Sequence, residues 1–546
     1  MQGLLTLNLS NNIINVVENS SFVNMPITIL DLSFNKIPNL NFLKNSLFNL
    51  TELYLNNNNI TIVPKYIFYN QTQIKKLDIS MNNIIRIEEY SLPLQNLQIL
   101  NIVGNRINGV IKQNIFSPAK YLKFLDLSYF NITNIDNLAF VDLPVIAKLN
   151  LSNNLIMKID VDSFKAINNL YSLDLSYNNI TEFKLNISNL PNLKALHLSH
   201  NNLTDITEIL TSLSNLTYLD LSHNNIKNVS QLGSNVFPNL IYLYLDNNNL
   251  KYFNNPKTNS LTTLIDLKLS SNNISEIHLS YYKDLMSVDL SNNNLTYINR
   301  TLLEKNDFLQ ALDVSKNKIV DLPPGTFQFM KNLKFLNLSS NYLTQLRYGS
   351  MKGLHKTEIL DLSKNNIDQL DVDIFHECDE LKTLIIDYNN IKTFDIERLI
   401  LVALKKLKTL SIGGNPLSCK DIVHNIKSTN NTFYAIRQVE ITSTDKIYHE
   451  DNVHGIKCGD YPDSMLTTTN IPVTTELTYK SVSPLSSAIA VLIWCSVLTV
   501  VVVTGGIVAY MKFYKKRILV IDSNMTMQLR NSIDLSGSDF QNDLLG

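Results

Sequence analysis

Three histidines have the spacing that would let them act together. His200 and His223 occupy the same place in two successive copies of a repeated segment, and His197 lies just before His200. If the copies form adjacent strands of a parallel sheet, the side chains of His200 and His223 lie within about 5 Å of each other. Imidazole groups at that distance can hold a metal ion or make a contact that changes with pH. Ordinary solvated histidines are the alternative, which we favour, and we predict no metal site.

No other set of residues indicates catalysis. The sequence has no P-loop, no GxGxxG segment and no HExxH segment, and its four cysteines form no CxxC pair. The formal net charge of −1 gives no general argument for binding nucleic acid. We therefore predict a protein that is not an enzyme, that needs no cofactor and that has no nucleic-acid partner.

The histidines belong to a unit that recurs along most of the chain. Residues 216–226 read LTYLDLSHNNI, residues 170–180 read LYSLDLSYNNI and residues 357–367 read TEILDLSKNNI. The pattern LxxLxLxxNxL is present in about 18 copies at a mean spacing of about 24 residues. One copy, residues 122–132, has Phe130 in place of the ninth-position asparagine. Such a regular period indicates a stacked repeat structure rather than separate amphipathic helices.

Each position of the unit has a predicted structural role. The leucines point inward, and Tyr218, Asp220 and His223 point outward from a short strand or its end. One unit cannot bury its leucines alone, but stacked neighbours can, so the strands should form one parallel sheet. The ninth-position asparagine can bond backbone groups that are buried where the chain turns inward. Phe130 cannot do this, and we expect a local irregularity there.

The repeat resembles that of extracellular leucine-rich repeat proteins, of the long subclass found in Toll-like receptors and in insect adhesion proteins such as chaoptin. The resemblance covers about residues 1–462. It implies an α/β repeat solenoid over residues 1–413, a horseshoe with a parallel β-sheet on its concave face. Met1 leads directly into QGLLTLNLS, without a signal peptide or an N-terminal cap. We expect a fragment or a truncated gene model, and a degenerate copy is the alternative.

The same resemblance implies a C-terminal cap over residues 414–462. The family pattern NPxxCxC is matched by Asn415, Pro416 and Cys419, but Asp421 stands in the place of the second cysteine. Only Cys458 follows within the cap, so the resemblance implies a Cys419–Cys458 disulfide and the loss of a second bridge. Two free thiols are the alternative.

The rest of the chain has the composition of a membrane anchor. Residues 463–487 are rich in Thr, Ser and Pro, which is typical of a flexible stalk. Residues 488–511 carry no charge and are long enough to cross a membrane as one helix. Lysines and an arginine follow at once, so the positive-inside rule places the 512–546 tail in the cytoplasm and the repeats outside. We predict a single-pass type I protein of the plasma membrane.

Many Asn-x-Ser/Thr sequons agree with extracellular repeats. Several occupy the tenth repeat position, at an exposed edge of the solenoid. These predicted glycosylation sites are Asn59, Asn131, Asn179, Asn202, Asn273 and Asn294.

A protein partner is predicted to bind the concave face. Sequons at the central fifth position occur at Asn150 and Asn337 but at none of the copies between them, so glycans leave this stretch open. Aromatic and histidine side chains gather on its N-terminal part, and tyrosine is enriched in binding hot spots. The candidate ligand-binding residues are Tyr171, Tyr177, His197, His200, Tyr218, Asp220, His223, Tyr242 and Tyr244. Ordinary exposed residues on a wide sheet are the alternative.

Two classes of function fit these features. The first is a cell-surface receptor or co-receptor that binds an extracellular protein ligand. Because the tail is too short for a Toll/interleukin-receptor signalling domain, such a receptor would signal through a partner. The second is a cell-adhesion protein whose ectodomain binds another ectodomain or a copy of itself.

Overall fold

The fold is taken from a computed structural model of the whole chain. The structure describes residues 5–419 except 93–94, 108, 117–118, 138, 166, 185–189, 207–212, 230–236 and 254–260. It also describes residues 422–423, 439–443, 452–453 and 456–458. The chain divides into two compact units, residues 1–462 and 463–546. The predicted stalk, membrane span and tail fall in the second unit and lie outside the described residues. Within the described residues, no helix is both long and apolar enough to span a membrane.

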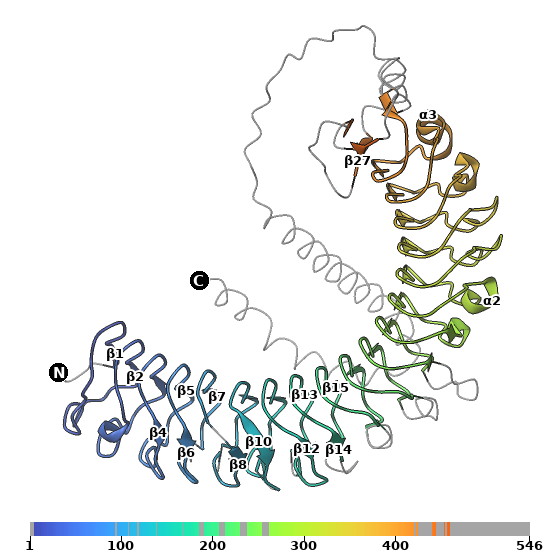
Figure 1. Cartoon of the computed structure of the whole chain (residues 1–546). Helices are drawn as coiled ribbons and strands as arrows, with labels where there is room; N and C mark the ends of the chain where they lie inside the picture. Colours follow the sequence, from blue (N-terminus) through green and yellow to red (C-terminus); the bar gives the residue numbers. More distant parts are fainter. Residues whose placement is uncertain are drawn as a thin grey trace, which may run out of the picture. The chain divides into compact units, whose positions relative to one another are not determined.

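The first unit is built on one parallel sheet of 19 strands, each of which is three residues long and pairs with the strands of the neighbouring repeats. In pairing order the strands are β1 (Thr6–Asn8), β2 (Ile29–Asp31), β3 (Glu52–Tyr54), β5 (Lys76–Asp78), β7 (Ile99–Asn101), β9 (Phe124–Asp126), β11 (Lys148–Asn150), β13 (Ser172–Asp174), β15 (Ala195–His197), β16 (Tyr218–Asp220), β17 (Tyr242–Tyr244), β19 (Asp266–Lys268), β21 (Ser287–Asp289), β22 (Ala311–Asp313), β23 (Phe335–Asn337), β24 (Ile359–Asp361), β25 (Thr383–Ile385), β26 (Thr409–Ser411) and β27 (Glu440–Thr442). Within this unit the sheet lies on the concave side, as Figure 1 shows for its labelled strands. The predicted parallel sheet is confirmed.

The return segments of the repeats contain short strand pairs and short helices. The strand pairs are β4 (Ile62–Val63) with β6 (Arg86–Ile87), β8 (Gly109–Ile111) with β10 (Ile132–Ile135), β12 (Lys158–Ile159) with β14 (Glu182–Phe183), β18 (Tyr252–Phe253) with β20 (Glu276–Ile277), and β28 (Asn452–Val453) with β29 (Ile456–Lys457) in the cap. The helical turns are η1 (Asn41–Leu43), η3 (Leu279–Tyr281), α2 (Arg300–Leu303), η4 (Val372–Phe375), α3 (Ile396–Arg398) and η5 (Leu399–Ala403). Because each return segment is too short to nucleate a long helix, the described unit is a β-solenoid rather than the predicted α/β solenoid.

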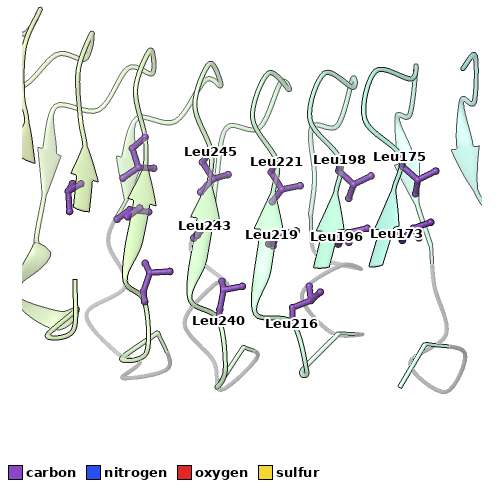
Figure 2. Packing of buried hydrophobic residues seen from close by; sticks show 14 of the residues in the cluster. Leu173, Leu175, Leu196, Leu198, Leu216, Leu219, Leu221, Leu240, Leu243 and Leu245 are labelled. Atoms are coloured by element: carbon purple, nitrogen blue, oxygen red, sulfur yellow. The ribbon is translucent and has the colours of Figure 1, made fainter. Parts of the chain in front are cut away.

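The core is a stack of leucine rows. Leu216, Leu219 and Leu221 are fully buried, and the equivalent leucines of neighbouring strands continue each row (Figure 2). Aromatic rings fill the side of the core away from the sheet, where Phe140 and Phe164 stack with their centroids 6.1 Å apart. Each row gains its burial from the repeats on both sides, so the sheet face is held in one register along the array.

The ninth-position asparagines join the repeats as predicted. Asn224 donates from Nδ2 to the carbonyls of Leu198, Leu221 and Ser222 at 2.9–3.1 Å, and its Oδ1 accepts the Leu203 N–H at 2.9 Å. The same arrangement recurs along the array, and these side chains are almost fully buried. Asparagine suits the position because its amide donates and accepts at once.

The expected irregularity at Phe130 is present. The Phe130 ring is fully buried, and Asn154 Oδ1 of the next repeat accepts two N–H groups, those of Phe130 and Ile132, each at 3.0 Å. The pairing of β8 with β10 shifts register between Ile132 and Asn134. The ladder is therefore interrupted at one repeat without ending the sheet.

The cap continues the sheet through β27, which pairs with β26. Cys419 and Cys458 form a disulfide, with their Cα atoms 5.1 Å apart. Cys378 is a free, buried thiol, and burial raises its pKa to about 12, so this sulfur behaves as a small apolar group.

Candidate binding surface

The alternation of each strand presents the candidate residues to solvent. In β16, Leu219 is fully buried between Tyr218 and Asp220, which lie at the third and fifth positions and are half-buried. In-register pairing then places equivalent positions of successive repeats side by side, Tyr218 next to Tyr242 and Asp220 next to Tyr244. The surface is therefore set by which residue types occupy these positions in neighbouring repeats.

The eighth position has a backbone conformation that sequence reasoning missed. In every repeat this residue has a positive φ, from 49° at Met81 to 74° at Gly104. The chain turns sharply there to send the ninth-position asparagine into the core. His200 and His223, with φ of 54° and 53°, share this conformation and consequently project in the same direction.

Three eighth-position residues, Tyr177, His200 and His223, form a stack of rings, which we call the edge stack. The ring centroids of Tyr177 and His200 are 4.0 Å apart, and those of His200 and His223 are 3.9 Å apart, with interplanar angles of 12° in both pairs. His223 Nε2 lies 3.2 Å from Asn247 Nδ2 in the next repeat. The predicted proximity of His200 and His223 is confirmed.

The geometry of the edge stack does not favour a metal site. Burial lowers the pKa of His200, the neighbouring His223 lowers it further, and Asp220 opposes both effects. The two imidazole rings are nearly parallel, so their in-plane lone pairs do not converge on a common ion. Among the described residues, no group of three or more histidine, cysteine or acidic side chains is placed to hold a metal.

A second group, the central cluster, consists of His197, Tyr218, Tyr242 and Tyr244. The Tyr218 ring centroid lies 4.6 Å from that of His197, 6.1 Å from that of Tyr242 and 5.4 Å from that of Tyr244, edge-on in the last pair. These four half-buried side chains come from the adjacent strands β15, β16 and β17. They form one group of contacting rings on the concave face.

Charged residues of the next repeat complete the central cluster. Tyr244 donates its hydroxyl to Asp266 Oδ2 at 3.0 Å, and Lys268 Nζ lies 4.4 Å from the centre of the Tyr244 ring. Burial raises the pKa of Asp266, which also lies near Asp289. Sequence reasoning missed Asp266 and Lys268. Reading the third and fifth positions of one further repeat would have identified Asp266 and Lys268, because these residues pair with Tyr242 and Tyr244.

Two aspartates near the cluster are held by serines in different ways. Asp220 Oδ1 accepts the N–H and the hydroxyl of Ser222 at 3.0 and 2.7 Å, within its own repeat. Asp246 Oδ1 accepts the same two groups of Ser270, from the next repeat. Burial raises the pKa of Asp246 to about 6, although the bonds from Ser270 favour its ionised form.

The remaining predicted site residues lie apart from these clusters. Tyr171 is 46% exposed, and its ring contact is with Lys194 Nζ, 5.7 Å from the ring centre. The tenth-position sequon asparagines Asn59, Asn131, Asn179, Asn202 and Asn273 are exposed and Asn294 is half-buried, so the structure leaves their glycosylation a prediction.

Known proteins share the repeat over part of their length. The chain is 32% identical to human Toll-like receptor 3 over 195 residues, which cover 32% of this chain and 21% of the receptor. It is 31% identical to human leucine-rich repeats and immunoglobulin-like domains protein 1 over 164 residues, 30% of this chain and 13% of that protein. Chaoptin of Drosophila melanogaster is 30% identical over 140 residues, 23% of this chain and 11% of chaoptin. The matched stretches thus span less than a quarter of each relative.

Solved structures share the solenoid. A leucine-rich repeat protein of Leptospira interrogans has a TM-score of 0.57 at 23% identity, covering 80% of this chain and 95% of its own. The Drosophila Toll–Spätzle complex has a TM-score of 0.58 at 18% identity, covering 78% of this chain and 56% of the other. At these identities the likeness concerns the fold alone.

The sequence pattern described as "Leucine rich repeat" matches residues 48–107, 95–156, 145–203, 168–226, 191–250, 307–367 and 355–417. These segments join into residues 48–250 and 307–417, which are more than half of the chain, and this protein therefore belongs to the leucine-rich repeat family.

Proposed function

We propose that the protein is a cell-surface receptor or co-receptor that binds an extracellular protein ligand through its concave face. The observation that carries the proposal is the contact between aromatic side chains on three successive strands, in which Tyr218 touches His197, Tyr242 and Tyr244. Half-buried tyrosines supply much contact area at small entropic cost, and they keep a polar tip for hydrogen bonds. A solenoid scaffold of this kind serves interaction rather than catalysis.

The membrane-related part of the proposal rests on sequence. The uncharged run at 488–511 and the basic residues after it support a single-pass protein with external repeats and an internal C-terminal tail. Similarity to human Toll-like receptor 3, a receptor, supports the same class.

A glycan placed at the centre of the surface tests the binding site. Asp220→Asn with Ser222→Thr creates the sequon Asn-Leu-Thr on β16. The matched control, Lys158→Asn with Asp160→Thr, places a sequon on β12, which Figure 1 shows on the side of the unit away from the large sheet. Lys158 is exposed and Asp160 is half-buried, and the substitutions remove a surface ion pair of 3.5 Å, which contributes little to stability.

The partner for this test is one that cross-links to the full chain on living cells. We expect the β16 glycan to abolish its binding and the β12 glycan to leave it unchanged. Occupancy of both sequons is checked by the mass shift on glycosidase treatment. Full binding with an occupied β16 site would refute the concave-face proposal.

The adhesion alternative is separated from the receptor by a different readout. Beads coated with the protein clump without any other protein if the repeats bind one another. Ligand-dependent association with a signalling partner in the membrane, without clumping, supports the receptor.

A further inference from the structure

Several tyrosines of this solenoid hold a lysine of the following repeat against their rings. Lys76 Nζ lies 5.1 Å from the centre of the Tyr54 ring, and Lys268 Nζ lies 4.4 Å from that of Tyr244. Tyr171 has the same relation to Lys194, at 5.7 Å. In each pair the lysine comes from the repeat after the tyrosine, although the pairs occupy different repeat positions and Tyr171 and Lys194 lie just outside their strands.

Among the described residues no lysine or arginine lies over the Tyr218 ring, whose ring neighbours are His197, Tyr242 and Tyr244. The next strand, β17, presents Tyr242 and Tyr244 where a lysine would have to lie. Burial raises the pKa of Tyr218, and the nearby carboxylates of Asp220, Asp174 and Asp266 raise it further. The charged groups around this ring are therefore negative. The nearest lysine along the fifth positions is Lys268, which lies over the Tyr244 ring instead.

The carboxylates beside Tyr218 keep an oxygen for a ligand. The hydrogen bonds to Asp220 within the described part of the chain come from Ser222 and go to Oδ1. Asp174 is held in the same way by Ser176, again through Oδ1. In both residues Oδ2 takes no hydrogen bond from another described residue, and both side chains are half-buried on the open sheet face.

We propose that Tyr218, Asp220 and Asp174 form a receptor site for a cationic side chain, arginine above all, from a basic segment of the protein ligand. This proposal rests on the proposed function and specifies the chemistry of the partner. Arginine fits better than lysine because its planar guanidinium stacks on a tyrosine ring and donates to carboxylate oxygens at the same time.

Charge along the sheet supports the same occupant. Along this part of the sheet the fifth positions carry more carboxylates than basic side chains: they are Asp174, His197, Asp220, Tyr244, Lys268, Asp289 and Asp313. Asp174 and Asp220 lie two strands apart with His197 between them, and an incoming cation is attracted by both carboxylates. A basic partner is also guided to this face during its approach.

The test uses the full chain in detergent micelles and a capped oligo-arginine peptide at physiological salt. The comparison peptide replaces every arginine with citrulline, which has nearly the same shape and no charge. We expect the arginine peptide to bind at least about tenfold more tightly than the citrulline peptide, in line with the size of paired cation–π and carboxylate contacts.

Substitutions locate the binding. Asp220→Ser should weaken arginine-peptide binding by about fivefold or more, whereas Asp361→Ser should leave it unchanged. Asp361 is the matched control because it also occupies a fifth position and binds its own serine, Ser363, but its third-position neighbour is Ile359. Serine is preferred to asparagine, since asparagine would create an Asn-Leu-Ser sequon at either site. Tyr218→Leu should also weaken binding, and Tyr218→Phe should largely preserve it because the ring face remains.

The outcomes separate this inference from the proposed function. Equal binding of the two peptides, or equal effects of Asp220→Ser and Asp361→Ser, would overturn the arginine site. If the glycan on β16 still blocks the natural partner in that event, the proposed function stands with a partner of other chemistry. If the β16 glycan blocks nothing while oligo-arginine binds as expected, the arginine site stands and the proposed function fails.

Discussion

The asparagine ladder gives the sharpest prediction about stability. Asn224→Ala removes four hydrogen bonds from a side chain that is 6% exposed. Asn225→Ala is the matched control, one residue later and exposed, with no side-chain hydrogen bond among the described residues. The two substitutions make the same change in composition at adjacent positions, so their difference isolates the buried amide.

The magnitude follows from which partners are left without a bond. The carbonyls of Leu198 and Leu221 also accept from Asn201 and Asn248, so they keep a donor. The Leu203 N–H has only Asn224 Oδ1, and it loses its partner in a buried position. One unsatisfied buried N–H costs about 1–3 kcal/mol, and with the weakened carbonyl bonds we expect a loss of about 2–3 kcal/mol. Asn225→Ala should change stability by less than about 0.5 kcal/mol.

Urea unfolding measures the total loss, and amide hydrogen exchange shows where it arises. Repeat arrays can unfold in parts, so the local readout carries more weight than a single midpoint. In Asn224→Ala, the Leu203 amide should exchange faster than in the parent chain, and amides several repeats away should not change. Equal losses for the two variants, or a Leu203 amide that stays protected, would show that the ladder does not carry this stability.

Two other residue environments give predictions of opposite sign. Because burial raises the folded-state pKa of Asp246 to about 6, its protonated form adds stability that is fully present below the unfolded value of 3.8 and is lost as the pH rises through about 6. The side-chain oxygen of Asp246→Asn can still accept from Ser270, so this variant should be more stable than the parent by about 1–2 kcal/mol at neutral pH. The gain should shrink progressively toward pH 4, as followed by urea midpoints. A gain that does not vary with pH would contradict this account. Gly353→Ala should cost about 3 kcal/mol or more, because its Cβ would lie 2.4 Å from the Phe327 carbonyl oxygen at a φ of +96°. Gly349→Ala has a similar φ of +84° but meets nothing closer than 3.5 Å, so thermal melts should show a loss of only about 1 kcal/mol from backbone strain.

The sequence was sufficient to predict the features that follow from the repeat period. Leucine spacing predicted the parallel sheet, and the shared eighth position predicted that His200 and His223 would lie side by side, because a parallel register is fixed once one face is buried. It was insufficient where side chains choose among rotamers or the backbone takes an unusual conformation. Tyr171 stands at the second repeat position, just before β13, and it lies against Lys194 instead of joining the central cluster. The left-handed turn at the eighth position is occupied by His, Tyr, Lys, Met and Phe as well as Asn and Gly. The residue type there therefore does not reveal the positive φ.

The asparagine ladder also sets an order in which the repeats complete their hydrogen bonds during synthesis. From Asn35 onward, each ninth-position asparagine accepts an N–H of the repeat before it, as Asn224 does from Leu203 and Asn248 from Ile226. During synthesis, a newly emerged coil therefore keeps one inward N–H unpaired until the next repeat, about 24 residues later, leaves the ribosome. Growth proceeds with one unfinished coil at its leading end, and each new repeat completes the one made before it. Cleavage between repeats should have unequal effects for the same reason: the upstream fragment ends in an unpaired N–H, whereas the downstream fragment begins with an asparagine that still bonds carbonyls of its own repeat.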